Sequence, residues 1–180
     1  DELRSATQVV VGEQQDQARR TTVEGALITV ENDSGYILSM VGGANFEAAN
    51  QFNRAVFAEV EPGSAFKPLY YAAAVDAGAI TPATLIYDTF RAFENADGSF
   101  YVPRNFQDVF VGPVLARQAL AQSMNVPSVV VLSRVGFDRA LETASSLLGI
   151  PRDEWANRGF VRRWPVGLGV VSVSPLEMAR

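Results

Sequence analysis

A short apolar hairpin followed by a long helical pattern constrains the fold of this chain more than any other feature. Residues 25–30 and 36–41 are strand-like runs, and the Asn-Asp-Ser-Gly sequence between them is typical of a hairpin turn. An Ala- and Tyr-rich stretch, residues 65–77, then predicts a helix that ends at Gly78. This order predicts a mixed α/β fold of the α+β type, with one antiparallel hairpin and a mainly helical subdomain.

Further helices are expected beyond the turn-rich residues 88–112. They are residues 113–122, a segment that begins near Pro127 and ends around Gly136, and residues 137–148 with Gly149 behind them. The residue before a proline is disfavoured in helical geometry, so Lys67, which precedes Pro68, is expected to depart from it.

The two ends of the chain differ in character. Residues 1–24 are polar and partly Gln-rich and predict an N-terminal helix or linker, so the folded domain is expected over residues 25–180. Ser174, Pro175 and Glu177 have the spacing of a capped helix start. The chain stops about one turn later, which is too short for a stable helix, and we therefore expect it to be part of a larger domain.

The composition excludes several chemistries. The chain has 180 residues, of which 48% are hydrophobic, and it contains no histidine and no cysteine. A Ser-His-Asp triad, a thiol nucleophile, a disulfide framework and an iron–sulfur site are therefore excluded. The carboxylates lack metal-ligand spacing, so neither a metal nor another cofactor is expected. A net charge of −5 without a basic stripe argues against a nucleic-acid partner, and no apolar run approaches the 18 residues of a membrane span.

The cationic residues are unevenly divided. Fourteen of the 15 are arginines, and Lys67 is the only lysine. An arginine cannot release its proton in a protein, whereas burial can bring a lysine to neutrality. Nitrogen base chemistry would therefore need Lys67 or the terminal amine, although a coding bias towards arginine explains the count equally well.

Two short motifs carry the candidate site. Ser64 and Lys67 are three residues apart at a helix start, where a neutral lysine can activate a serine and backbone N–H groups can bind an oxyanion. Ser123 and Asn125 follow the next helical segment and offer a hydroxyl and an amide. Ordinary alternatives are a serine cap with a solvated lysine, and a helix-capping turn.

These motifs lie within an ordered series that resembles the transpeptidase domain of penicillin-binding proteins, and more narrowly the bifunctional class A group. The resemblance covers roughly residues 25–180. Its segments, in order, are Val41–Gly43, Phe46, Asn50–Ala55, Pro62–Pro68, Thr81–Thr84, Pro103–Phe106, Gly112–Val114, Arg117–Leu120, Ser123–Pro127 and Pro175–Ala179.

The resemblance implies a β-lactamase/transpeptidase-like fold and a D,D-transpeptidase that acts on peptidoglycan stem peptides. By that analogy Ser64 attacks the D-Ala-D-Ala carbonyl, Lys67 activates it, Ser123 passes a proton to the leaving amine and Asn125 holds the substrate amide. β-Lactam antibiotics would acylate the same serine. The implied location is extracytoplasmic, with membrane attachment only through upstream segments that this chain lacks.

The sequence departs from the family pattern in two respects. The third motif, Lys-Thr-Gly or Lys-Ser-Gly on a later strand, is absent because the chain has no second lysine, and Leu115 stands where Ser or Thr is expected. The fold is therefore expected to be incomplete, containing only the first hairpin of the sheet. Unless a separate chain supplies the missing C-terminal part, the hairpin should expose an apolar face and favour association. Acylation should be slow or absent.

Other functions share these motifs. A serine β-lactamase or a β-lactam sensor has the same Ser-x-x-Lys and Ser-x-Asn patterns, but residues 51–55 favour the transpeptidase and no deacylating glutamate is evident. A non-catalytic interaction module of the cell wall would keep the fold without the chemistry. The four intact motif residues argue against that alternative.

Overall fold

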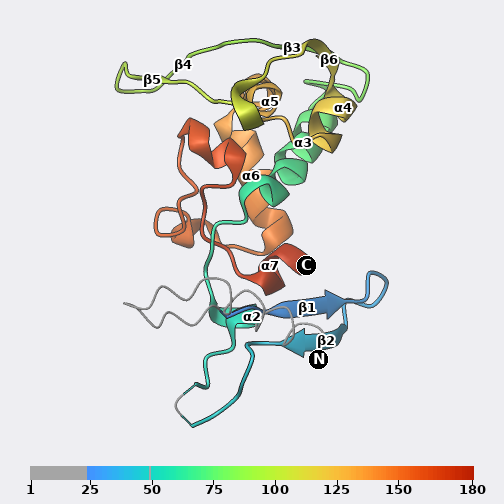
Figure 1. Cartoon of the computed structure of the whole chain (residues 1–180), viewed down its shortest axis with the longest axis vertical. Coiled ribbons are helices and arrows are strands. Elements are labelled where there is room, and N and C mark those ends of the chain that lie inside the picture. The colour runs from blue at the N-terminus through green and yellow to red at the C-terminus, as the bar shows by residue number, and fades with distance from the viewer. Residues whose placement is uncertain (1–23, 49) are drawn as a thin grey trace. The chain divides into compact units, whose positions relative to one another are not determined.

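The computed structural model describes residues 24–48 and 50–180 (Figure 1), so the helix or linker expected over residues 1–24 lies almost wholly outside the described residues. The chain divides into two compact units. One, the hairpin unit, contains residues 1–60 and 173–180, and the other, the helical unit, contains residues 61–172.

The hairpin unit is built on two antiparallel strands. Strands β1 (Leu27–Val30) and β2 (Ile37–Val41) pair in the register that joins Leu27 to Val41, with an irregularity beside Val30. The predicted hairpin is therefore confirmed. Two short helices, α2 (Arg54–Phe57) and α7 (Pro175–Ala179), complete the unit. The expected capping box is present, since Ser174 Oγ accepts from the Glu177 N–H and Glu177 accepts from the Ser174 N–H.

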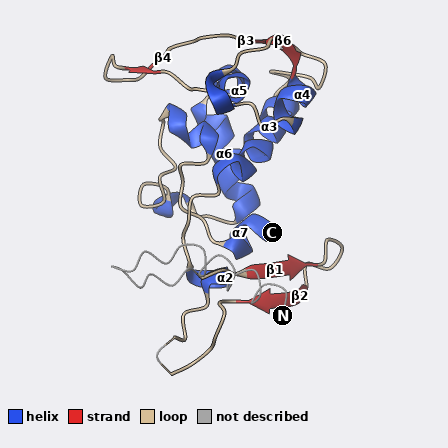
Figure 2. Ribbon diagram, in the orientation of Figure 1, coloured by secondary structure: helices blue, strands red, loops and turns tan. Residues whose placement is uncertain are grey.

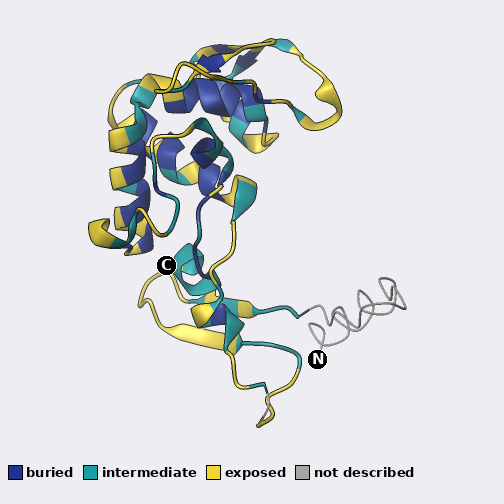
Figure 3. Cartoon of the chain, turned by 90° about the vertical axis from the view of Figure 1, so that its left-hand side faces the viewer, coloured by how far each residue is buried: buried dark blue, intermediate teal, exposed yellow. Residues whose placement is uncertain are grey.

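Little of the hairpin unit is buried. Most of β2 is exposed (Figure 3), and the Leu38 side chain is 62% exposed. The buried residues described in this unit are Ala55, Val173 and Ser174. The strands thus form their backbone hydrogen bonds without covering their apolar side chains.

The helical unit contains the core of the molecule. Helix α3 (Lys67–Asp76) packs against α5 (Asn125–Val135) and α6 (Phe137–Leu148), and the shorter α4 (Ala116–Ala121) packs against α5 (Figure 2). The predicted ends of α6 are confirmed, with Gly149 in the left-handed conformation behind it. The predictions for α3 and α5 are also confirmed, with shifts of a few residues at their ends.

Two short sheets and four 3-10 segments connect these helices. Strand β3 (Leu85–Asp88) pairs antiparallel with β6 (Gly112–Leu115), and β4 (Phe93–Glu94) pairs with β5 (Phe100–Tyr101). The 3-10 segments are η1 (Gly63–Phe66), η2 (Phe106–Asp108), η3 (Arg152–Glu154) and η4 (Trp164–Leu168).

Two local predictions are wrong. Residues 113–115 form a strand instead of the start of a helix, because their backbone pairs with β3, a partner that no local pattern reveals. Lys67 has φ −53° and ψ −45°, which is helical despite the following proline. The 3-10 turn before Lys67 continues directly into α3, and that continuity outweighs the preference imposed by Pro68.

The first turn of α4 compensates for the absence of a Ser or Thr cap at Leu115. The N–H groups of Ala116 and Arg117 donate to the carbonyls of Thr84 and Pro82 at 2.9 and 3.1 Å. These acceptors satisfy two of the amides that the first turn of a helix leaves without a partner inside the helix. Among the described residues, no helix is both long and apolar enough to span a membrane.

Candidate active site

Ser64 lies in the 3-10 turn η1, directly before α3. Its side chain is exposed, and its carbonyl accepts the N–H of Lys67, which continues the chain into the helix. In a 3-10 turn, side chains three residues apart are nearly eclipsed, so Ser64 and Lys67 project on the same side of the backbone. The turn approaches another segment closely, because a Cβ on Gly169 would lie 2.0 Å from the carbonyl oxygen of Gly63.

The Lys67 side chain is 1% exposed, which excludes a solvated first-turn lysine. Its amine donates to three oxygen atoms: the Ser123 carbonyl at 2.7 Å, the Ser123 hydroxyl at 3.1 Å and Asn125 Oδ1 at 2.8 Å. Three acceptors match the three N–H bonds of an ammonium group. The structure therefore brings Lys67, Ser123 and Asn125 into one hydrogen-bonded cluster.

Burial also changes the pKa of the Lys67 amine. Desolvation lowers the pKa of Lys67 from 10.5 to about 8. The neutral fraction at pH 7 rises about 300-fold, to about one amine in ten. A small but useful population of Lys67 is thus able to accept a proton at neutral pH.

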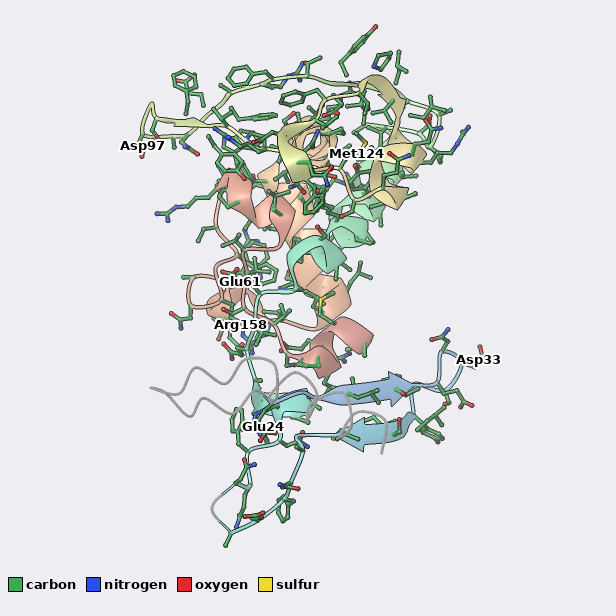
Figure 4. All side chains as sticks on the ribbon, viewed as in Figure 1. Glu24, Asp33, Glu61, Asp97, Met124 and Arg158 are labelled. Carbon is green, nitrogen blue, oxygen red and sulfur yellow. The ribbon has the colours of Figure 1, made fainter. Side chains whose placement is uncertain are left out.

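Ser123 occupies a backbone position that usually favours glycine. The N–H groups of Ser123 and Met124 donate to the carbonyls of Leu120 and Ala119, which closes the end of α4 as a Schellman motif. Ser123 takes the left-handed position of that motif with φ +54°. A non-glycine residue there costs about 1 kcal/mol or more, and such strain is concentrated at functional sites. Met124, labelled in Figure 4, marks this loop.

Asn125 is the first residue of α5, and its side chain is held at both ends. Its Oδ1 accepts from the Lys67 amine, and its Nδ2 donates to the carbonyl of Arg104 at 2.8 Å. One N–H of the amide is therefore used within the protein, and the other has no partner in the part of the chain that the structure describes. Among the described residues, Ser64 Oγ has no hydrogen-bond partner.

Two further residues support this cluster, and no motif in the sequence indicated a role for either of them. Asn105 accepts from the backbone N–H groups of Asn125 and Val126, and the buried Asp88 accepts from Asn105. The segment Pro103–Phe106 contributed to the family resemblance, but its spacing carries no local signal of these contacts.

Comparison with known proteins identifies the family. A family model described as the penicillin binding protein transpeptidase domain matches residues 25–180. The chain belongs to this family of transpeptidase domains.

Two curated relatives illustrate the match. Penicillin-binding protein 1A of Pseudomonas aeruginosa is 36% identical over 185 residues, which cover 99% of this chain and 21% of that protein. Penicillin-binding protein 1A of Escherichia coli is 33% identical over 159 residues, which cover 88% of this chain and 18% of that protein. The chain thus spans about a fifth of the length of these relatives.

A solved structure gives the same result. The crystal structure of penicillin-binding protein 1A from Haemophilus influenzae superposes with a TM-score of 0.79 at 30% identity, over 90% of this chain and 23% of that one. Penicillin-binding protein PBP2 of Pseudomonas aeruginosa has a TM-score of 0.67 at 18% identity and supports the fold alone. The predicted family and fold class are confirmed.

Proposed function

We propose that this chain carries the serine acyl-enzyme chemistry of a peptidoglycan D,D-transpeptidase. The observation that carries the proposal is the buried Lys67 amine, whose pKa is lowered to about 8 and which lies three residues after an exposed serine. Family membership supplies the reaction class, and the absence of histidine leaves this lysine as the side-chain nitrogen base.

The acylation half-reaction follows from these positions. Neutral Lys67 takes the proton of Ser64, and Ser64 Oγ forms a bond to the carbonyl carbon of the penultimate D-Ala. The Ser64 N–H, at the start of the helix, donates to the resulting oxyanion. Ser123 receives the proton from Lys67 and delivers it to the leaving nitrogen, so the C–N bond breaks and D-Ala departs. Asn125 uses its free N–H to hold the amide of the stem peptide.

The second half-reaction reverses the roles. The amine of a neighbouring stem peptide attacks the acyl carbon and forms a new amide, its proton passes to Lys67, and Ser64 regains a proton as it leaves. A β-lactam follows the first half-reaction, but its leaving nitrogen stays tethered. Stem peptides and β-lactams both reach the protein at the extracytoplasmic cell wall, so we expect the reaction to take place there. Membrane attachment would come from other segments of the protein.

The chain alone is expected to acylate slowly. It has no second lysine and therefore no Lys-Thr-Gly or Lys-Ser-Gly motif to provide the other oxyanion donor, a loss worth about 10²–10³ in rate. A C-terminal part of the same domain, supplied as a separate chain or in the same polypeptide, would restore that donor.

Intact-protein mass spectrometry with a fluorescent penicillin tests the proposal. The 180-residue chain is incubated with the penicillin for hours. In parallel, a chimera is tested in which this chain replaces the aligned segment of the Pseudomonas aeruginosa relative. We expect a slow adduct on the chain and a rapid one on the chimera, both lost in Ser64→Ala and strongly slowed in Lys67→Ala. A folded chimera that forms no adduct at Ser64 would overturn the proposal, and an adduct hydrolysed within seconds would indicate a β-lactamase. Rapid stoichiometric labelling of the chain alone would overturn its expected impairment.

A further inference from the structure

A buried carboxylate lies behind the site without taking part in it. Asp88, the last residue of β3, is 0% exposed and faces inward, as Ile86 does. Its Oδ1 accepts from Asn105 Nδ2 at 2.7 Å, and its Oδ2 accepts from the Val111 N–H at 2.9 Å. Burial of a carboxylate is costly unless such donors are supplied, so its presence here needs a reason.

Asn105 uses its whole hydrogen-bonding capacity. Its Nδ2 donates to Asp88 and to the Val109 carbonyl, and its Oδ1 accepts the N–H groups of Asn125 and Val126 at 3.1 Å each. A carboxylate only accepts hydrogen bonds, so Asp88 forces the Nδ2 side of the Asn105 amide towards itself. The oxygen of Asn105 must then face the first turn of α5.

This contact replaces a local helix cap. Met124, the residue before α5, makes no side-chain cap hydrogen bond, so Asn105 caps the helix from a distant loop. The same loop holds the Asn125 side chain, because the Arg104 carbonyl accepts from Asn125 Nδ2. Gln107 and Asp108, directly beyond, have φ +63° and +55°, a strained path that persists only where surrounding contacts impose it.

We propose that Asp88 and Asn105 are positioning residues of the active site: Asp88 fixes the orientation of the Asn105 amide, and Asn105 fixes the start of α5, so that Asn125 and Ser123 face the Lys67 amine. The inference rests on the proposed roles of Lys67 and Asn125. It assigns these two residues to the placement of the cluster and not to contact with substrate.

Exchange of the two side chains is a sharp test, because it is nearly isosteric. In Asp88→Asn, one acceptor oxygen becomes an NH2 group, so the side chain loses either the Val111 N–H or Asn105 Nδ2 as a donor. In the double variant with Asn105→Asp, Asn at 88 donates to Asp at 105, whose carboxylate again accepts from the first amides of α5 but no longer donates to the Val109 carbonyl. The single variant should therefore disturb the site, and the double variant should restore it in part.

Lys67 provides the readout. It is the only lysine, so lysine labelled with ¹³C at Cε and ¹⁵N at Nζ gives a single side-chain signal whose pH titration reports this amine alone. In Asp88→Asn and Asn105→Ala of the full 180-residue chain, the titration midpoint should move by about half a unit or more, since the amine loses an aligned acceptor or gains water. Amide exchange at residues 125 and 126 should accelerate about tenfold. The double variant should return both part of the way towards wild type.

Ser145→Ala serves as the control for general destabilisation, since Ser145 is buried in α6 and, among the described residues, its hydroxyl donates only to the Glu142 carbonyl. It should leave the Lys67 midpoint unchanged. An unchanged midpoint in both single variants, or a double variant that restores nothing, would overturn the inference. These measurements do not depend on acylation, whereas failure of the proposed function would appear as an unlabelled Ser64 in the chimera.

Discussion

The helical unit and the hairpin unit are built from similar proportions of apolar residues but use them differently. In the helical unit, α3 is buried along one side and encloses even a lysine, and nearly all the buried hydrophobic residues described belong to this unit. In the hairpin unit, Ile37, Leu38 and Met40 are exposed although they lie on a regular strand. Backbone pairing alone can form a strand, but only side-chain packing can desolvate a charged group.

The difference between the two units shows which part of the chain can support the candidate site. Ser64, Lys67, Ser123 and Asn125 all lie in the helical unit, where packing lowers the pKa of the lysine. The hairpin contributes no member of this cluster. The core and the candidate site are therefore properties of the same part of the chain, and the comparison can be tested by perturbing each unit separately.

The largest expected effect is at Gly169 in the helical unit. Gly169→Ala should lower the free energy of unfolding by about 3 kcal/mol, because φ is +78° and the new Cβ would lie 2.0 Å from the Gly63 carbonyl oxygen. Urea denaturation followed by tryptophan fluorescence measures the loss. Gly98→Ala is the matched control, with φ +79° and open space around it, and should cost about 1–2 kcal/mol. Equal losses would show that close packing against η1 is unimportant.

The second effect is a pH dependence that belongs to the helical unit. The folded state holds the pKa of Lys67 at about 8, below its unfolded value of 10.5, so the unfolded chain binds the proton more tightly. The burial penalty is therefore full below pH 8, and stability should rise by about 2 kcal/mol between pH 8 and 10. Above pH 10 the gain reverses, because burial raises the pKa of Tyr70 and Tyr71.

Denaturation midpoints collected across this pH range test the effect. Lys67→Met should flatten the curve between pH 8 and 10, since an apolar side chain of similar length does not titrate. A wild-type profile that is level over the same range would contradict the burial of this amine.

A smaller effect separates stability from function at Ser123. Ser123→Gly should raise the free energy of unfolding by about 1 kcal/mol, because glycine adopts φ +54° without strain, while acylation in the chimera falls about 10²-fold with the hydroxyl gone. Ser123→Ala is the control, since it loses the hydroxyl but keeps the strained backbone. Equal stability of the Ser123→Gly and Ser123→Ala variants would contradict the backbone strain expected at Ser123.

The smallest effect on stability is expected in the hairpin unit. Leu38→Lys should change the free energy of unfolding by no more than about 0.5 kcal/mol, because the side chain it replaces is already exposed. It should nevertheless reduce self-association, which light scattering over a concentration series measures. Asn32→Lys adds the same charge in the turn without removing apolar surface and should have less effect. A wild-type chain that is monomeric throughout would contradict the expected association.

Features governed by neighbouring residues were predictable from the sequence. The hairpin turn, the end of α6 at Gly149 and the capping box at Ser174 each depend on contacts within a few positions. The strand at residues 112–115 was not predictable, because its partner β3 is distant in sequence. The helical geometry of Lys67 was missed because the rule for residues before proline ignores the turn that precedes them.

The candidate site likewise has some features that the sequence determined and others that only the tertiary structure decided. The sequence alone determined its residue types: a serine and the only lysine three positions apart, a Ser-x-Asn pattern, and no histidine to compete. The tertiary structure decided that Lys67 is buried, that Ser123 and Asn125 reach its amine, and that Asp88 and Asn105 hold them there. A sequence specifies which groups can ionise or donate, but desolvation and hydrogen-bond geometry arise only when distant segments pack together.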